Sequence, residues 1–203
     1  MLGRSRRLFT HAAGFSKRRV YIQQDEIASK LSVGFENARS VCTSRKLHQS
    51  ATSSSTTSYN LVAFADGACR GNPGPGSCGA LIIDSDTQRV VISRYRYLGD
   101  QETNNTTEYQ GLLLALELAE ELELKTLKIC MDSELVIKQM RGEYRVKAAH
   151  LRALHATCRS RCQDFERIEF THVPRNENAD ADRLANLALD IQAELDKDKQ
   201  TKA

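Results

Sequence analysis

Residues 59–76 read YNLVAFADGACRGNPGPG, and this stretch determines which folds are open to the chain. Residues 59–65 are rich in apolar side chains that alternate with others, a pattern that predicts a β-strand. Asp66 follows directly, and the glycines and prolines of residues 71–76 require a turn. A carboxylate beside a protein core is costly unless it is paired or binds a metal. We therefore expect a strand whose end carries an acid in need of a partner.

Strand-like and helix-like stretches alternate along the chain after this turn. Further strands are expected at residues 78–83, 89–98, 127–131 and 167–173, and helices at residues 104–122, 133–140, 147–162 and 179–195. The order is three strands, one helix, one strand, two helices, one strand and a last helix. This order predicts an α/β fold with a five-stranded mixed sheet flanked by helices.

Three more acids stand where a core boundary is expected. Asp132 ends an apolar strand, Glu108 lies in the first turns of the long helix, and Asp182 lies in the first turns of the last helix. Glu108 shares one helical face with Leu112 and Ala115, so it points toward the sheet. Taken singly, each of these acids is most simply a helix or strand cap. Four together indicate an all-oxygen site that suits Mg²⁺ or Mn²⁺ rather than zinc.

Four motifs, in this order, resemble those of the type 1 ribonucleases H. They are DGACRGNPGPG at 66–76, TNNTTEY at 103–109, DSELV at 132–136, and VPRNEN at 173–178 followed by ADRLAN at 181–186. Each motif alone is weak, but the set is specific and covers nearly all of residues 59–193. The resemblance implies a ribonuclease H-like fold. It also implies an endonuclease that hydrolyses the RNA strand of RNA–DNA hybrids and leaves 5′-phosphomonoesters.

The resemblance also implies roles for individual residues. In that family four acids hold two divalent metal ions, a role that falls here to Asp66, Glu108, Asp132 and Asp182, with Mg²⁺ expected and Mn²⁺ possible. The hybrid-contacting positions that the resemblance implies are Gly71, Asn72, Thr103, Asn104, Asn105, Ser133, Arg175 and Asn178. Among these, Asn72 and Asn104 match positions that meet the minor groove, although Asn72 also suits a simple turn.

The chain departs from the family pattern in two places. Many members carry a basic, tryptophan-containing loop after the third motif, whereas residues 142–146 form a short connection and the chain has no tryptophan. Residues 138–167 hold eight Lys and Arg side chains, which indicate either a phosphate-contacting surface or a solvated helix face. The glycine-rich loop with a histidine before the last helix is also absent, and Arg175 is the nearest polar group that could partly replace that histidine. This shorter form resembles a subgroup found in archaea, some bacteria and plants.

The basic character of the chain belongs to its N-terminal segment. Residues 1–58 hold ten basic and three acidic residues, whereas residues 59–203 hold 19 basic and 23 acidic residues. The first 24 residues are Arg-rich and free of acids, which favours a mitochondrial transit peptide over a plastid, nuclear or cytoplasmic location. We expect a disordered leader and Ser/Thr-rich linker at 1–58, a catalytic domain at 59–193 and a charged tail at 194–203.

Other classes of function are less consistent with these residues. The main alternative is a catalytically weak binder of RNA–DNA hybrid or double-stranded RNA on the same fold, but a binder does not need four clustered carboxylates. A 3′–5′ exonuclease would carry a second acid two residues after the first, where this chain has Ala68. The six cysteines have no zinc-site spacing, which indicates free thiols. No apolar run is long enough to span a bilayer, so we expect no membrane partner. We expect a monomer whose partner is RNA–DNA hybrid.

Overall fold

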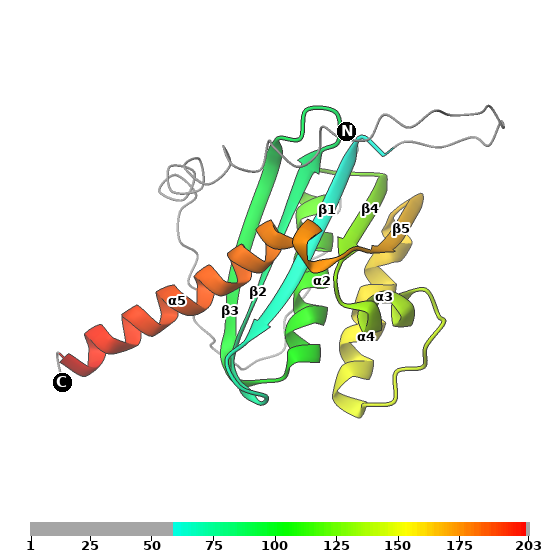
Figure 1. The fold of residues 1–203 in the computed structure, drawn as a ribbon. Coiled ribbons are helices and arrows are strands. Elements are labelled where there is room, and N and C mark those ends of the chain that lie inside the picture. The colour runs from blue at the N-terminus through cyan, green and yellow to red at the C-terminus, as the bar shows by residue number, and fades with distance from the viewer. Residues whose placement is uncertain (1–58, 202–203) are drawn as a thin grey trace, which may run out of the picture. The chain divides into compact units, whose positions relative to one another are not determined.

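The computed structural model describes residues 59–201. Within this range the chain forms one sheet with helices on both of its faces (Figure 1). The leader and linker predicted at residues 1–58 lie outside the described residues, so those assignments stay predictions.

The sheet has five strands in the spatial order β3-β2-β1-β4-β5. The first three strands, β1 (Leu61–Cys69), β2 (Gly74–Asp84) and β3 (Val90–Glu102), pair with one another in antiparallel fashion, β1 with β2 and β2 with β3. The last two, β4 (Thr126–Met131) and β5 (Arg167–His172), pair in parallel, and β4 is also parallel to β1. The predicted five-stranded mixed sheet is therefore confirmed.

Four α-helices cover this sheet. They are α2 (Asn104–Glu121), α3 (Glu134–Met140), α4 (Ala149–Arg161) and α5 (Ala179–Thr201), with short 3-10 turns η2 (Cys162–Asp164) and η3 (Arg175–Glu177). In Figure 1 α5 crosses the near face of the sheet, while α2 lies behind it and α4 packs against α2. No helix within residues 59–201 is long and apolar enough to cross a membrane.

The main core lies between the sheet and α2. Alternate residues of the central strands, such as Ala63 and Ile129, are completely buried, as the period of two in a strand requires when one face meets a helix. Helix α2 is buried on several sides, with Leu112, Leu114 and Leu116 all inaccessible, because α4 packs against it from behind. The helix that carries Glu108 is therefore held rigidly by packing.

Helix α5 is fixed to the opposite face at two small residues of β2. The Ser77 hydroxyl donates a hydrogen bond to the Ala185 carbonyl at 2.6 Å. Gly79 lies so close to the helix that a Cβ there would be 2.6 Å from the Ala185 nitrogen. This close approach sets the position of the first turns of α5, which include Asp182.

Several element boundaries differ from the sequence expectation. Strand β2 begins at Gly74 instead of residue 78, and β3 continues to Glu102 instead of ending at residue 98. Strand β1 does not end at residue 65 but continues through Asp66 to Cys69, because Asp66 pairs with Gly79 and Cys69 pairs with Gly76 in β2. The small and polar residues there have no pattern that predicts a strand, and they are held in the sheet by their backbone pairing with β2. Helix α5 continues to Thr201, so most of the predicted charged tail 194–203 is helical. Side-chain bonds from Asp196 to Gln192 and Lys199, one turn away on either side, support this extension.

Candidate active site

Two of the four acids come from neighbouring parallel strands. Phe64 of β1 pairs with Cys130 of β4, so Asp66 and Asp132 lie at the same level, each two residues farther along. The carboxyl ends of adjacent parallel strands are where α/β folds commonly place functional groups. Asp66 is only 4% exposed, which makes it a buried acid rather than a surface cap.

Glu108 reaches this pair because α2 approaches β1 very closely. A Cβ on Gly111 would lie 2.5 Å from the Asp66 carbonyl oxygen, and a Cβ on Gly67 would overlap the backbone of Thr107 and Glu108. The start of α2 is fixed by Thr103, whose hydroxyl accepts from the Thr106 amide while the Thr106 hydroxyl accepts from the Thr103 amide. Two glycines and a capping box therefore bring Glu108 beside Asp66.

The fourth acid and two polar residues come from η3 and the first turn of α5. Arg175 donates from Nη2 to Asp182 Oδ1 at 2.9 Å. Asn178 donates from Nδ2 to Asp132 Oδ1 at 2.7 Å and to the Ala65 carbonyl at 3.0 Å. Asn178 is 1% exposed, so the structure places it inside the cluster, where its amide hydrogens have protein acceptors.

The electrostatics of the cluster show a shortage of positive charge. Burial, followed by the charges of Asp132 and Asp182, raises the pKa of Asp66 to about 8. Burial, followed by the charges of Asp66 and Asp132, raises the pKa of Glu108 well above its usual value. Glu108 Oε2 is buried without a hydrogen-bond partner. A buried carboxylate oxygen that lacks a donor is unusual, and a bound cation would satisfy it.

These four acids fit a divalent cation in chemistry, because all of their donor atoms are carboxylate oxygens. They do not yet form a closed ligand shell: within residues 59–201 no three His, Cys, Asp or Glu side chains converge as a preassembled metal centre. Two of the acids accept hydrogen bonds from side chains of the protein, Asp132 from Asn178 and Asp182 from Arg175. A metal would therefore have to compete with at least one of these contacts.

Several predicted substrate-contacting residues lie together on the surface. Gly71 and Asn72 are exposed in the turn between β1 and β2, and Asn104 and Asn105 are exposed at the start of α2. Asn72 Oδ1 accepts from the Asn104 backbone amide at 3.4 Å, so the two asparagines adjoin although they are 32 residues apart. Gly71 has a φ of 107°, which a residue with a side chain rarely adopts.

Other predicted contacts have different surroundings. The Thr103 hydroxyl caps α2, and the Asn178 amide donates a hydrogen bond to Asp132. Both side chains therefore make contacts within the domain. Ser133 stands at the N-cap of α3 and makes no side-chain cap bond, so its hydroxyl is available to a ligand.

Most of the basic residues between 138 and 167 hold the fold together. Arg141 donates to the Phe170 carbonyl at 2.6 and 3.0 Å, and Arg159 donates to the Met140 carbonyl at 3.2 Å. Arg161 pairs with Glu120 and Glu117. Lys138 pairs with Glu134, and Arg152 donates to the Val146 and Lys147 carbonyls. Arg167 stacks on the Tyr59 ring. Arg145 and Lys147 are exposed and have no such contact among the described residues, so they are the better candidates for phosphate contact.

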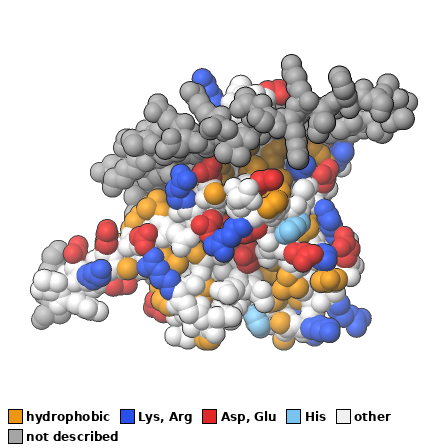
Figure 2. Space-filling model, viewed as in Figure 1, with side chains coloured by type: hydrophobic (Ala, Val, Ile, Leu, Met, Phe, Trp, Pro, Cys, Tyr) orange, Lys and Arg blue, Asp and Glu red, His pale blue; other side chains and the backbone are white. Residues whose placement is uncertain are grey.

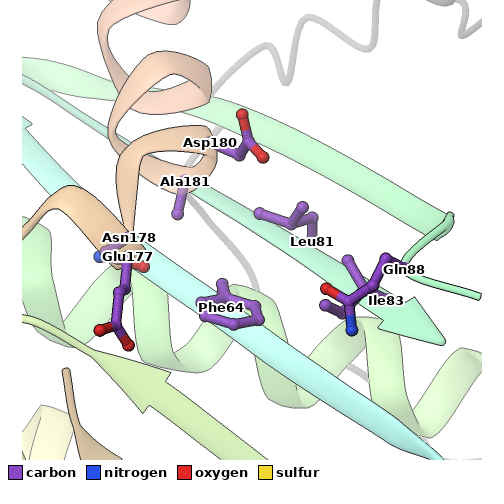
Figure 3. A pocket seen from close by; sticks show the side chains of 8 residues that line it. All are labelled: Phe64, Leu81, Ile83, Gln88, Glu177, Asn178, Asp180 and Ala181. Carbon is purple, nitrogen blue, oxygen red and sulfur yellow. The ribbon is translucent and has the colours of Figure 1, made fainter. Parts of the chain in front are cut away.

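A shallow hollow of about 130 Å³ lies beside the acids on the α5 face of the sheet. Phe64 and Leu81 line it, with Ala181 at one end and Ile83 and Gln88 at the other (Figure 3). Small-molecule pockets usually measure about 300–1,000 Å³, so this hollow is too small for a nucleotide.

Sequence reasoning missed two residues on which the site depends. Gly67 and Gly111 have no functional group and act through the space that they leave for β1 and α2. The Asp66-Gly67 pair suggests a turn, and only the packing of β1 against α2 reveals the close contact. A glycine inside the apolar run of α2 was the one available signal, because glycine in a helix is unfavourable without a packing reason.

The sheet order, together with acids from β1, α2, the end of β4 and α5, defines a ribonuclease H-like domain. Comparison with known proteins narrows the class. The model of the reverse transcriptase-like family matches residues 64–188. A bifunctional protein of Mycobacterium tuberculosis is 40% identical over 134 residues, which are 66% of this chain and 36% of that protein. Ribonuclease HI of Halobacterium salinarum is 38% identical over 128 residues, 63% of each chain.

Solved structures agree with these relatives. The N-terminal RNase H domain of the M. tuberculosis protein has a TM-score of 0.63, with 66% of this chain and 96% of that chain covered. LC11-RNase H1, solved in complex with RNA/DNA hybrid, is 34% identical with a TM-score of 0.62 and covers 66% and 99%. The chain therefore belongs to the ribonuclease H family, and it spans about a third of the length of the first curated relatives that it matches.

The raised pKa of Asp66 makes the stability of the metal-free protein depend on pH. Between pH 4 and 8 the folded protein keeps a proton on Asp66 that the unfolded chain has released, so the free energy of unfolding falls as pH rises toward about 8. In EDTA, we expect the melting temperature to fall from pH 5 to pH 8. Asp66→Asn should make this decline shallower, and saturating Mg²⁺ should reverse it by stabilising the ionised acids.

Circular dichroism melts of the wild type and two variants measure this dependence. Asp164→Asn is the matched control, because Asp164 is an exposed acid of η2 that takes no part in the cluster. Equal pH slopes for the wild type and Asp66→Asn would contradict the electrostatic account.

Proposed function

We propose that this protein is an endonuclease that hydrolyses the RNA strand of RNA–DNA hybrids. The observation that carries the proposal is the meeting of Asp66, Glu108, Asp132 and Asp182, with a buried Glu108 oxygen that lacks a partner. The named relatives support it, since they are ribonucleases H and one was solved with RNA/DNA hybrid. An inert hybrid-binding protein would gain nothing from clustered acids that repel phosphate.

The four acids would hold two Mg²⁺ ions, with Mn²⁺ as an alternative. Ions held there would supply activation of a water molecule and stabilisation of the leaving 3′-oxygen, so that hydrolysis would leave a 5′-phosphate on the product. The residues of the chain supply the framework: Asp66 and Asp132 fix the site to the sheet, and α2 and α5 bring Glu108 and Asp182 to it. Asn178 orients Asp132, because its amide is anchored at the same time to the Ala65 carbonyl.

The exposed asparagines would recognise the RNA strand. RNA differs from DNA by its 2′-hydroxyl, which lies in the wide, shallow minor groove of an A-form-like duplex. Asn72 and Asn104 adjoin on the surface, and an asparagine amide both donates and accepts hydrogen bonds. The glycine backbone at Gly71 lets a strand approach closely. Asn105, on the exposed side of the first turn of α2, would contact the DNA strand.

Phosphate contacts would come from a few exposed cations rather than from a uniformly basic face. Figure 2 shows acidic and basic side chains interleaved on the visible, described part of the domain. Arg145 and Lys147, between α3 and α4, are exposed. Two phosphate contacts of this kind would give binding a modest dependence on salt.

We propose that the protein acts as a monomer.

Asp132→Asn tests the catalytic assignment. It removes one formal charge from the metal-binding set while it keeps the size of the side chain. We expect hybrid cleavage in Mg²⁺ to fall by more than the roughly 10- to 100-fold that loss of an outer-sphere partner causes. Glu134→Gln is the matched control, since Glu134 is exposed two residues away and pairs with Lys138. Near-normal cleavage by folded Asp132→Asn would refute the assignment.

Asn104→Ala tests the recognition of RNA. Loss of one hydrogen bond should weaken hybrid binding by on the order of 1 kcal/mol, while duplex DNA binding and its salt dependence stay unchanged. Arg145 and Lys147, both changed to Ala, should weaken hybrid and duplex DNA alike and reduce the slope against log salt by about 2. Fluorescence anisotropy in Ca²⁺, at several salt concentrations, measures both effects. If Asn104→Ala weakens hybrid and duplex DNA equally, the asparagine does not select RNA.

A further inference from the structure

Arg175 is a cation that interacts electrostatically with the four acids. Its Nη2 lies 2.9 Å from Asp182 Oδ1. The acids raise the pKa of Arg175, with Asp182 contributing most, then Asp66 and Asp132, and the Arg175 charge in turn acts to lower the pKa of Glu108. One guanidinium therefore interacts with all four carboxylates.

The Arg175 side chain is held there loosely. It is 78% exposed, whereas Asp182 is 30% exposed, so the guanidinium lies on the solvent side of the pair. Among the described residues, Asp182 is the hydrogen-bond and ion-pair partner of Arg175. An ion pair of this exposure is weak, because water competes for both groups. The guanidinium can therefore leave Asp182 without breaking any packing.

Asn178, three residues later, provides a contrast. It is 1% exposed and bonds both Asp132 and the Ala65 carbonyl. Movement of this side chain would break two bonds and expose buried polar atoms. Of these two side chains that donate to the acids, Asn178 is thus a fixed support and Arg175 is a displaceable one.

We propose that Arg175 is a tethered counter-cation, which occupies Asp182 while no metal is bound and is displaced when a divalent ion takes that carboxylate. This inference rests on the proposed function, because it concerns the metals that the acids would hold. Two consequences follow. Arg175 stabilises the metal-free protein, and it lowers the apparent affinity for divalent ions, since binding must first release the competing state. Arg175 thereby sets the metal concentration at which the site fills.

Three variants separate this role from a general effect of charge. Arg175→Gln removes the cation, and Arg175→Lys keeps it. Arg183→Gln is the matched control: it removes one positive charge from the first turns of α5, but Arg183 pairs with Asp180, which is not one of the four acids. Each variant of the full chain is titrated with Mg²⁺ and with Mn²⁺ by calorimetry, without nucleic acid. Melting temperatures are measured in EDTA and in saturating Mg²⁺.

We expect Arg175→Gln to bind the ions about two- to five-fold more tightly than the wild type, as the strength of an exposed ion pair implies. The metal affinities of Arg175→Lys and Arg183→Gln should differ from that of the wild type by less than about two-fold. In EDTA, Arg175→Gln should melt at a lower temperature than Arg183→Gln, and this difference should disappear in saturating Mg²⁺.

Unchanged or weaker metal binding by Arg175→Gln would overturn the inference, and so would equal effects of Arg175→Gln and Arg183→Gln. In those cases the wild type still binds metal, so the proposed function stands. Absence of any divalent binding by the wild type would overturn the inference together with the metal-dependent function. The two failures are therefore distinguishable.

Discussion

The close contact between β1 and the first turns of α2 is the constraint on which the rest of the site depends. It exists because Gly67 and Gly111 leave no side chain between the strand and the helix. Without this contact Glu108 would face the sheet at ordinary packing distance from Asp66. With it, the acids of a strand and a helix become neighbours. The burial of α2 by the sheet and α4 then keeps the arrangement rigid.

This arrangement has an electrostatic consequence that links stability to function. Buried carboxylates that face one another disfavour their own ionisation, as the raised pKa values of Asp66 and Glu108 show. The fold tolerates the cluster because its packing is strong elsewhere and because Arg175 and Asn178 engage two of the acids. The same shortage of positive charge is what would draw divalent ions to the site. The destabilising feature and the functional feature are thus one set of residues.

The sequence predicted the parts of this protein that follow from local pattern. Strand and helix order followed from periodicity, and the four acids followed from their places at the ends of apolar segments and from the motifs that resemble ribonucleases H. The parts it did not predict depend on neighbours distant in the chain. Strand β1 continues past Asp66 because β2 pairs with it, and Gly111 matters only because Asp66 lies opposite. Arg141 is one of the basic residues of 138–167 for which a phosphate-contacting surface was considered, but its side chain donates to the Phe170 carbonyl.

Gly111→Ala tests the central claim most directly, namely that close contact between β1 and α2 builds the site. The added methyl group would lie 2.5 Å from the Asp66 carbonyl oxygen, whereas ordinary contacts lie at 3.4–4 Å, so strand and helix must separate by about 1 Å. We predict that the variant stays folded by circular dichroism but cleaves RNA–DNA hybrid on the order of 100-fold more slowly, because misplacement of that size carries such a cost. Gln110→Ala, the neighbouring helix position, should cleave like the wild type. Wild-type cleavage rates in Gly111→Ala would contradict the account.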